Sequence, residues 1–185
     1  MKKQALRATT LRRLRAQSES SRKKKSLAIG RRLLRTQAYR RAKRLLCYVA
    51  IDGEVWTRPI LERALADGKR VFVPVVTDRT RRHMVVAEVR DPEKDLAHKG
   101  HYGIPHPLML TSKEIPLRRL DLVIVPGVAF DKTGHRLGRG LGYFDRFLER
   151  VPASTPTVGL AFKFQTVQRL PVESHDRPVQ RVITE

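Results

Sequence analysis

The residues with the clearest chemical potential lie in a glycine-rich segment, residues 126–145. Glycine occupies every second position from 138 to 142, and Arg136 and Arg139 stand close to these glycines. A glycine backbone can approach a ligand closely because no Cβ intervenes. A guanidinium offers paired N–H donors that match two oxygens of a phosphate. The segment therefore predicts a loop that binds phosphate groups.

This segment matches neither of the two common phosphate-binding patterns. It contains no Gly-x4-Gly-Lys-Ser/Thr sequence, and its glycines lack the spacing of the dinucleotide-binding pattern. Glycines alone would also fit a flexible loop whose two arginines are solvated. The choice between these interpretations depends on the elements that precede and follow the segment.

The flanking elements favour the phosphate interpretation. The apolar run at residues 122–125 is typical of a buried strand, and a helix is expected from about Tyr143 to Arg150. Ligands of open α/β sheets bind beyond the carboxyl ends of the strands. A helix N-terminus at such a place offers free N–H groups to an anion. Strand, loop and helix together predict an anion site.

The rest of the chain alternates between predicted strands and helices. One helix begins after Thr57, which can act as its N-cap, and has Pro59 in its first turn. Pro74 places its strand near a sheet edge or a strand end, and residues 91–116 are expected to be irregular. The other strands are expected at 45–51, 71–76, 84–89, 157–161 and 182–184. This order predicts a single three-layer α/β domain over residues 1–185, with a largely parallel, Rossmann-like sheet.

Residues 1–44 carry most of the positive charge. They hold 17 Lys or Arg residues against one acid, Glu19, in a chain whose net charge is +21. Apolar residues at helical spacing predict a pair of helices packed on the sheet. Their stripes consist of Leu6, Thr10 and Leu14, and then of Leu27, Leu33 and Leu34. The charge fits a nucleic-acid surface, an attraction for anionic small molecules or a solvated helix face.

The composition also limits the setting of the protein. The longest apolar run, residues 45–51, is far shorter than the roughly 20 residues that cross a bilayer, so no membrane partner is expected. The single cysteine, Cys47, lies inside this run and is expected to be a buried, inert thiol. One cysteine cannot form an internal disulfide, which agrees with a cytoplasmic location.

Four ordered segments of the chain resemble one known family. The string Arg136-Leu-Gly-Arg-Gly-Leu-Gly-Tyr-Phe-Asp145, with Pro126-Gly and Phe130-Asp before it, closely resembles the signature loop of the 5-formyltetrahydrofolate cyclo-ligase family. The other matching segments are Lys3-x-x-Leu6-Arg7, Asp52-Gly-Glu54-Val-x-Thr57, and a C-terminal pattern from Gly159 through Leu170-Pro and His175-Asp176 to Ile183-Thr-Glu185. Because the match starts at Lys3, the basic N-terminus is expected to belong to the enzyme rather than to a removable transit peptide.

The resemblance implies an ATP-dependent enzyme of folate metabolism. The family uses ATP and Mg²⁺ to convert 5-formyltetrahydrofolate into 5,10-methenyltetrahydrofolate, with release of ADP and phosphate. The formyl oxygen is a poor leaving group until it is phosphorylated, so phosphoryl transfer is expected to precede ring closure. The folate is expected to be accepted with or without a polyglutamate chain, and the enzyme is expected to be a monomer.

The same resemblance assigns the site residues. Arg139 and Arg136 are expected to be catalytic because they hold the phosphates, and Glu54 is expected to accept paired hydrogen bonds from the pterin ring. The expected ATP-binding residues are Lys3, Arg7, Arg136, Leu137, Gly138, Arg139, Gly140, Leu141, Gly142, Tyr143 and Phe144. The expected folate-binding residues are Val49, Glu54, Arg139, Gly140 and Tyr143. Asp145 and Asp176 are expected to hold Mg²⁺, which takes one or two carboxylates together with substrate phosphates.

Other interpretations stay open at this point. The positions that depart from the family's pattern are His106, Leu141, Phe144 and Gln180, which would suit an altered affinity or a repurposed relative. Asp145 also fits a first-turn carboxylate favoured by the helix dipole, Asp176 a surface acid, and Glu54 a solvated turn acid. A different ATP-dependent ligase or kinase is one rival function, and nucleic-acid binding is another. The second is less favoured because Tyr39 is the one aromatic residue within 1–44 that could stack on a base.

Overall fold

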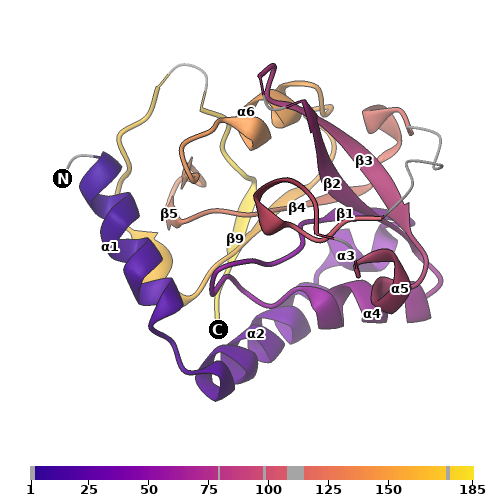
Figure 1. Ribbon diagram of the computed structural model, residues 1–185, viewed down its shortest axis with the longest axis horizontal. Helices are drawn as coiled ribbons and strands as arrows, with labels where there is room; N and C mark the ends of the chain where they lie inside the picture. Colours follow the sequence, from indigo (N-terminus) through magenta and orange to yellow (C-terminus); the bar gives the residue numbers. More distant parts are fainter. Residues whose placement is uncertain (1–2, 79, 98, 108–114, 174–175) are drawn as a thin grey trace.

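The computed structural model describes residues 3–78, 80–97, 99–107, 115–173 and 176–185, which form an α/β fold around a six-stranded sheet (Figure 1). The strand order is β3-β2-β1-β4-β7-β9. β3 runs antiparallel to β2, whereas the other neighbouring strands of this sheet are parallel. The strands are β1 (Arg44–Cys47), β2 (Arg70–Asp78), β3 (His83–Val89), β4 (Leu122–Val125), β7 (Thr157–Leu160) and β9 (Arg181–Ile183). The predicted α/β fold with a largely parallel sheet is confirmed.

Side chains of the strands alternate between two apolar layers, one on each face of the sheet. Leu45 and Cys47 pack with the helices on one face, and Leu46 packs on the opposite face. Successive side chains of a strand point to opposite faces, which explains the alternation. The first face is covered by α2 (Glu19–Leu34), α3 (Gln37–Arg41) and α4 (Arg58–Ala66), with α5 (Pro92–Asp95) beside α4, and the other face by α6 (Tyr143–Glu149) (Figure 1). These are the three predicted layers.

A second, three-stranded sheet supports the glycine-rich segment. It consists of β6 (Arg136–Leu137), β5 (Ala129–Asp131) and β8 (Thr166–Val167). Between β5 and β6, the buried carboxylate of Asp131 accepts the backbone N–H groups of Thr133 and His135 at 2.9 and 3.0 Å. Such local side-chain bonds fix the conformation of a turn. The small sheet therefore delivers the chain to residue 138 in a defined direction.

Three helices, rather than the predicted pair, form the N-terminal part. Ser18 separates α1 (Lys3–Arg15) from α2 and accepts the N–H of Ser21 as the N-cap of α2. Thr36 starts α3 in the same way by accepting the N–H of Tyr39. Ser and Thr are favoured at this position because their oxygens satisfy an N–H group that the helix leaves unpaired. In the described parts of the chain, no helix is both long and apolar enough to span a bilayer.

The apolar stripe predicted for the first helix is confirmed, whereas the second is wrong in part. The buried residues of α1 are the predicted Leu6, Thr10 and Leu14. In α2, Leu33 is buried but Leu27 is 46 % exposed, because the helix turns Ile29 and Leu33 toward the sheet. α1 also lies mainly against the small sheet, where Leu6 packs in one apolar cluster with Leu137.

The segment after β1 differs from the prediction at both ends. The strand stops at Cys47 rather than at residue 51, because the chain turns there toward the start of α4. The hydroxyl of Thr57 donates to Tyr48 O at 2.8 Å and accepts from Ala50 N at 3.2 Å. It therefore holds the turn and makes no hydrogen bond to the helix that it precedes, contrary to the predicted cap.

Two smaller differences concern β2 and the segment after β3. β2 continues through Pro74, which lies beyond Phe72, the last residue of β2 that is paired with β1. The missing N–H of Pro74 therefore interrupts no bond on that side. The segment predicted to be irregular contains α5 and a 3-10 turn, η1 (His101–Gly103), and residues 108–114 lie outside the described part of the chain.

Candidate functional site

A pocket of about 390 Å³ opens beyond β1 and β4, where the sequence placed the ligand site. Its walls come from the turn after β1, from β2 and β3, from residues 101–106, and from the loop of residues 138–142, called the glycine loop below. The predicted residues that line it are Val49, Glu54, Arg136, Gly138, Arg139, Leu141, Gly142, Tyr143, Phe144 and Asp145. The predicted residues Lys3, Arg7, Leu137, Gly140 and Asp176 are not part of its wall.

Arg7 of α1 contacts the backbone of the glycine loop without lining the pocket. Its Nε donates to Gly138 O at 2.9 Å, and a Cβ on Gly140 would lie 3.6 Å from the guanidinium carbon. Gly140 and Gly142 have φ angles of 104° and 68°, which residues with a side chain rarely adopt. Arg7 therefore contacts the loop through its backbone, and the loop conformation requires the glycines seen in the sequence.

Arg136 is buried beneath the glycine loop. Its Nη2 donates to Asp145 Oδ1 at 2.7 Å, and its Nη1 donates to Arg177 O. Burial lowers the pKa of Arg136, and the charge of Asp145 opposes that shift. These two bonds use two of the five N–H donors of the guanidinium and orient Asp145. Arg136 lines the pocket with donors to spare, and its contact with a phosphate stays a prediction.

Lys3 joins the first helix to the C-terminal segment. Its Nζ lies 2.9 Å from Asp176 Oδ2 and 2.8 Å from Glu173 Oε1. Burial alone would lower the pKa of Lys3, but the two carboxylates outweigh it and raise that pKa. Asp176 also acts electrostatically on Arg136, as Asp145 does. The two predicted metal ligands thus both influence the same guanidinium, while His175 lies outside the described residues.

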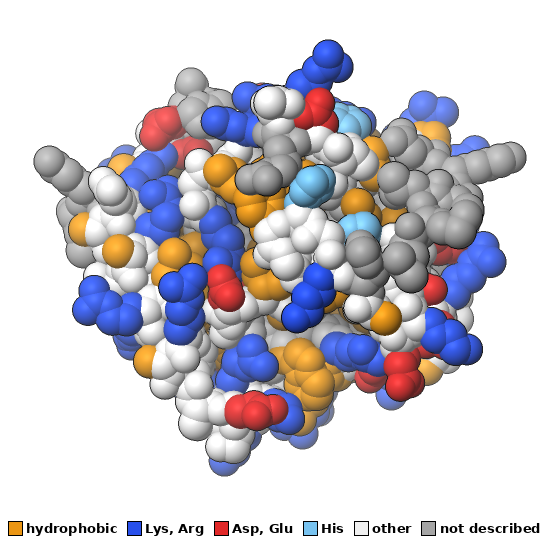
Figure 2. All heavy atoms as spheres, viewed as in Figure 1, with side chains coloured by type: hydrophobic (Ala, Val, Ile, Leu, Met, Phe, Trp, Pro, Cys, Tyr) orange, Lys and Arg blue, Asp and Glu red, His pale blue; other side chains and the backbone are white. Residues whose placement is uncertain are grey.

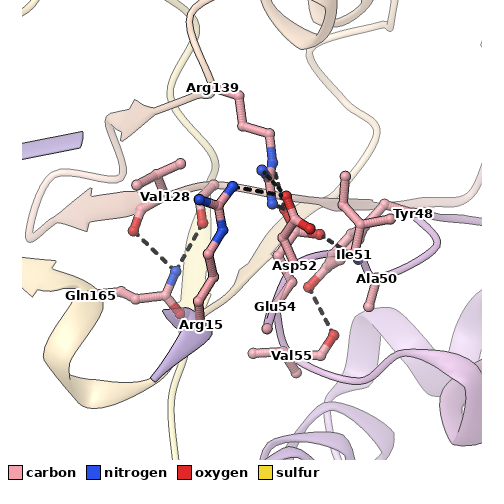
Figure 3. A network of polar contacts seen from close by, with 12 residues as sticks. Arg15, Tyr48, Ala50, Ile51, Asp52, Glu54, Val55, Val128, Arg139 and Gln165 are labelled. Carbon is pink, nitrogen blue, oxygen red and sulfur yellow. Dashed lines mark hydrogen bonds and ion pairs between the residues drawn. The ribbon is translucent and has the colours of Figure 1, made fainter. Parts of the chain in front are cut away.

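Arg139 and Glu54, which are 85 positions apart in the sequence, meet in the pocket (Figure 3). Arg139 donates from Nε and Nη2 to Glu54 Oε1 at 3.1 and 3.0 Å. Its Nη1 donates to Asp52 Oδ2 at 3.0 Å. Arg15, at the end of α1, reaches the same oxygen of Asp52 at 3.3 Å. The residues predicted to hold phosphate and pterin are therefore direct partners.

Glu54 is a buried carboxylate, so the alternative of a solvated turn acid is wrong. Its side chain is 10 % exposed, and its Oε2 accepts the N–H of Ile51 at 3.1 Å. Burial raises the pKa of Glu54, although the charge of Arg139 opposes this shift. Burial alone would also raise the pKa of Asp52, but hydrogen bonds from Arg15 and Arg139 outweigh this effect and lower that pKa. The pKa values of these two acids of one turn are therefore shifted in opposite directions, that of Asp52 downward and that of Glu54 upward.

We expect Asp52→Asn and Glu54→Gln to change the pH dependence of stability with opposite signs. The lowered pKa of Asp52 means that its ionised form stabilises the fold above an unfolded-state pKa of about 3.9, and that this contribution is lost as the pH falls through the folded-state pKa. The raised pKa of Glu54, which faces Arg139, Asp52 and Tyr48, makes its ionisation destabilising as the pH rises above about 4.3.

Urea unfolding of the two variants and the wild type between pH 3 and pH 8 checks this expectation. Relative to the wild type, Asp52→Asn should become less stable as the pH rises, whereas Glu54→Gln should become relatively more stable. Parallel curves for the two variants would contradict the assigned electrostatics of the turn.

Sequence reasoning missed part of the pocket wall. Tyr102 of η1 lines the pocket with a φ of 60°, and its hydroxyl lies 3.2 Å from that of Tyr143. Val75 and Met84 supply an apolar wall from β2 and β3. The sequence predicted only that residues 91–116 are irregular, which gave no direction for the side chain of Tyr102. Val75 and Met84 have the pattern of any strand residue, so the sequence held no signal for them.

The donors near Arg136 are compatible with a hard cation. Among the residues that the structure describes, no group of three or more His, Cys, Asp or Glu side chains is placed to hold a metal ion. Mg²⁺ needs only one or two carboxylates when substrate phosphates complete its shell. Asp145, in the pocket wall, and Asp176 fit that donor chemistry, and their assignment stays a prediction.

Known proteins resemble this chain along its whole length. The model of the 5-formyltetrahydrofolate cyclo-ligase family matches residues 1–185. The mouse 5-formyltetrahydrofolate cyclo-ligase is 33 % identical over 99 % of this chain and 93 % of its own length. The protein of the same name from Escherichia coli K12 is 36 % identical over 74 % of this chain and 75 % of its own length.

Solved structures agree with these sequence matches. The NMR structure of a 5,10-methenyltetrahydrofolate synthetase from Aquifex aeolicus has a TM-score of 0.85 and 32 % identity, covering 100 % of this chain and 90 % of that one. A 5,10-methenyltetrahydrofolate synthetase from Mycoplasma pneumoniae has a TM-score of 0.79 over 100 % of this chain and 99 % of that one, and at 22 % identity it shows the fold alone. The matched family, the signature loop and the pocket around it agree, and the chain belongs to the 5-formyltetrahydrofolate cyclo-ligase family of enzymes.

Proposed function

We propose that this protein uses ATP to convert 5-formyltetrahydrofolate into 5,10-methenyltetrahydrofolate, with release of ADP and phosphate. The observation that carries the proposal is the contact of a buried carboxylate, Glu54, with Arg139 of the glycine loop inside one pocket. A site that takes both a pterin and a phosphate needs an acceptor for ring N–H groups next to a phosphate donor. Membership of the family supplies the reaction class.

The chemistry requires activation of the formyl oxygen. Transfer of the terminal phosphoryl group of ATP forms a new P–O bond to that oxygen and releases ADP. The N10 nitrogen of the folate then attacks the formyl carbon and gives up its proton. The C–O bond breaks last, so that the former formyl oxygen leaves as part of inorganic phosphate. The net reaction consumes no water and needs no oxidant or reductant.

The residues of the pocket suit these steps. Phosphoryl transfer depends on positioning and on stabilisation of charge, which Arg139 supplies from the glycine loop. The buried oxygens of Glu54 can accept hydrogen bonds from a ring N–H and the adjacent amino group, a planar two-point match. Val75 and Met84 provide apolar surface for the folate rings. Tyr102 and Tyr143 lie edge to face at the same pocket, with ring centroids 6.1 Å apart.

Mg²⁺ is the expected companion of ATP in this site. We assign Asp145 and Asp176 as its protein ligands, because carboxylates are preferred by hard cations and both lie near Arg136. The bound cation would neutralise charge on the phosphates. Arg136 contributes by orienting Asp145 through the 2.7 Å ion pair.

Product formation tests the proposed function. The purified protein should form the methenyl product from 5-formyltetrahydrofolate when ATP and Mg²⁺ are both present, and the absorbance of that product follows its formation. Omission of ATP, or of the folate, should abolish release of ADP. ATP hydrolysis that is independent of the folate would favour a different ATP-dependent enzyme, and a folded protein that binds ATP without making product would reduce the case to a shared fold.

The basic N-terminal helices suggest a preference among folates. Figure 2 shows Lys and Arg side chains distributed over the face that includes α1 and α2. We include polyglutamylated folates among the proposed substrates, because their chain of carboxylates complements this charge. Nucleic-acid binding by the same helices is less favoured, because Tyr39 is the one aromatic residue within 1–44 that could stack on a base. The cytoplasmic location and the monomeric state stay predictions.

A further inference from the structure

The side chains proposed to bind the phosphate and the pterin, Arg139 and Glu54, are hydrogen-bonded to each other. Arg139 directs Nε and Nη2 at Glu54 and Nη1 at Asp52 (Figure 3). A phosphate that takes these N–H groups must compete with both carboxylates. A pterin that takes both oxygens of Glu54 must likewise displace the bonds from Arg139. A phosphate on the Nε–Nη2 edge of Arg139 and a pterin on both oxygens of Glu54 each replace hydrogen bonds of the Arg139–Glu54 ion pair.

The two carboxylates differ in what happens when Arg139 leaves. The side chain of Asp52 is 46 % exposed, and it retains Arg15 at 3.3 Å. The side chain of Glu54 is 10 % exposed, and within the described residues its other hydrogen bond is the one from Ile51 N. A charge that stays buried after losing its counter-ion is strongly destabilising, whereas an exposed one is solvated. Departure of Arg139 therefore leaves Glu54, and not Asp52, with an unfavourable environment.

The backbone keeps the two acids in these positions. Asp52 and Gly53 have φ angles of 46° and 79°, and a Cβ on Gly53 would overlap Leu14 O of α1. The turn is thus pressed against the end of α1 in a conformation that is sparsely populated for Asp52. Such a turn cannot readily move Glu54 out to solvent when its counter-ion departs.

We propose that the Arg139–Glu54 ion pair couples the two substrates, so that each one raises the affinity of the other. A nucleotide that takes Arg139 leaves a buried carboxylate ready to accept the N–H groups of the pterin. A folate that takes Glu54 leaves Arg139 ready to turn to a phosphate. Whichever ligand binds first breaks the pair, and the second binds without that cost. By linkage the factor is the same in both directions. This inference rests on the proposed function, because it assumes a pterin at Glu54 and a phosphate at Arg139.

Calorimetry with a non-hydrolysable ATP analogue (β,γ-methylene-ATP) and 5-formyltetrahydrofolate measures the coupling without turnover. In the wild type, the dissociation constant of the analogue should fall about tenfold in the presence of the folate, within the usual 5–150-fold range of such couplings. The coupling ratio is the dissociation constant of the analogue without folate divided by that with folate. In Glu54→Gln this ratio should be close to one. The substitution should also tighten binding of the analogue several-fold in the absence of folate, because no buried carboxylate then holds Arg139.

Asp52→Asn is the matched control. It removes a carboxylate that lies 3.0 Å from the same guanidinium, as Glu54 does, but from a more exposed position. The proposal predicts that the ratio is retained in Asp52→Asn and lost in Glu54→Gln. Arg139→Gln provides a second route, because it also removes the ion pair and should also abolish the coupling.

The outcomes separate this inference from the proposed function. A ratio of one in a wild type that makes product would overturn the coupling while the function stands. An equal loss of the ratio in Asp52→Asn and Glu54→Gln would also overturn it, because net charge rather than burial would then be responsible. Glu54→Gln could bind the folate too weakly for the ratio to be measured. In that case the affinity of this variant for the analogue in the absence of folate decides, and an affinity equal to that of the wild type contradicts the proposal. A wild type that binds neither ligand would count against the proposed function itself.

Discussion

Replacing Arg139 with alanine is expected to lower kcat/KM for 5-formyltetrahydrofolate about a hundredfold. A contact that stabilises the charge of transferring phosphate is worth about 3 kcal/mol in the transition state. Arg139 lies in the glycine loop, outside the apolar core clusters, with a side chain that is 29 % exposed. Steady-state rates at saturating ATP, followed by absorbance of the product, check this expectation.

Two controls distinguish a lost phosphate contact from indirect effects. Arg118→Ala removes an exposed arginine from the 3-10 turn η2 (Leu117–Arg119), away from the pocket wall, and should leave the rate unchanged. Arg139→Ala leaves Glu54 buried without its cation, so urea unfolding of this variant measures any lost stability separately, and the rate should fall even under conditions in which the variant is fully folded. An unchanged rate in Arg139→Ala would exclude this residue as the phosphate clamp.

Replacing Gly53 with alanine is expected to reduce the free energy of unfolding by about 3 kcal/mol or more. The residue has a φ of 79°, which costs about 1–3 kcal/mol for a residue with a Cβ. The added Cβ would also overlap backbone atoms of Leu14, which cannot swing aside as a side chain can. Urea unfolding measures the loss. Because Asp52 and Glu54 flank this glycine, affinity for the folate should fall as well.

Gly68→Ala separates the two causes. Gly68 follows α4 with a φ of 73°, and a Cβ there would meet no atom within 4 Å. This variant should therefore lose only about 1 kcal/mol, from backbone conformation alone. It should keep full affinity for the folate. Equal losses in the two variants would show that the turn is not pressed against α1 as the structure has it.

Local patterns predicted the elements that carry the glycine loop. The strand at 122–125 and the helix from Tyr143 are encoded by short apolar runs and by neighbouring glycines, and both occur as expected. The resemblance to the family added the expected ligand-binding roles of the residues in the loop. Ten of the assigned residues line one pocket, and eight of them belong to residues 136–145, which are adjacent in the sequence as well as in space. Val49 and Glu54 come from the turn after β1.

Contacts between segments that are distant in the sequence could not be predicted from the sequence. Nothing in the spacing of Glu54 and Arg139 shows that they form an ion pair, since their meeting depends on the packing of α1, the turn after β1 and the small sheet. Thr57 fits an N-cap by type, yet tertiary structure gives its hydroxyl a different partner in Tyr48. The direction in which Tyr102 faces follows from a left-handed backbone that its sequence does not signal.

The fate of the formyl oxygen tests most directly whether ATP activates this group in the proposed way. 5-Formyltetrahydrofolate labelled with ¹⁸O in the formyl group is incubated with the protein, ATP and Mg²⁺, and the released phosphate is analysed by mass spectrometry. Each phosphate should carry one labelled oxygen, because the C–O bond breaks after that oxygen has been phosphorylated. Methenyl product accompanied by unlabelled phosphate, with the label in water, would contradict the account.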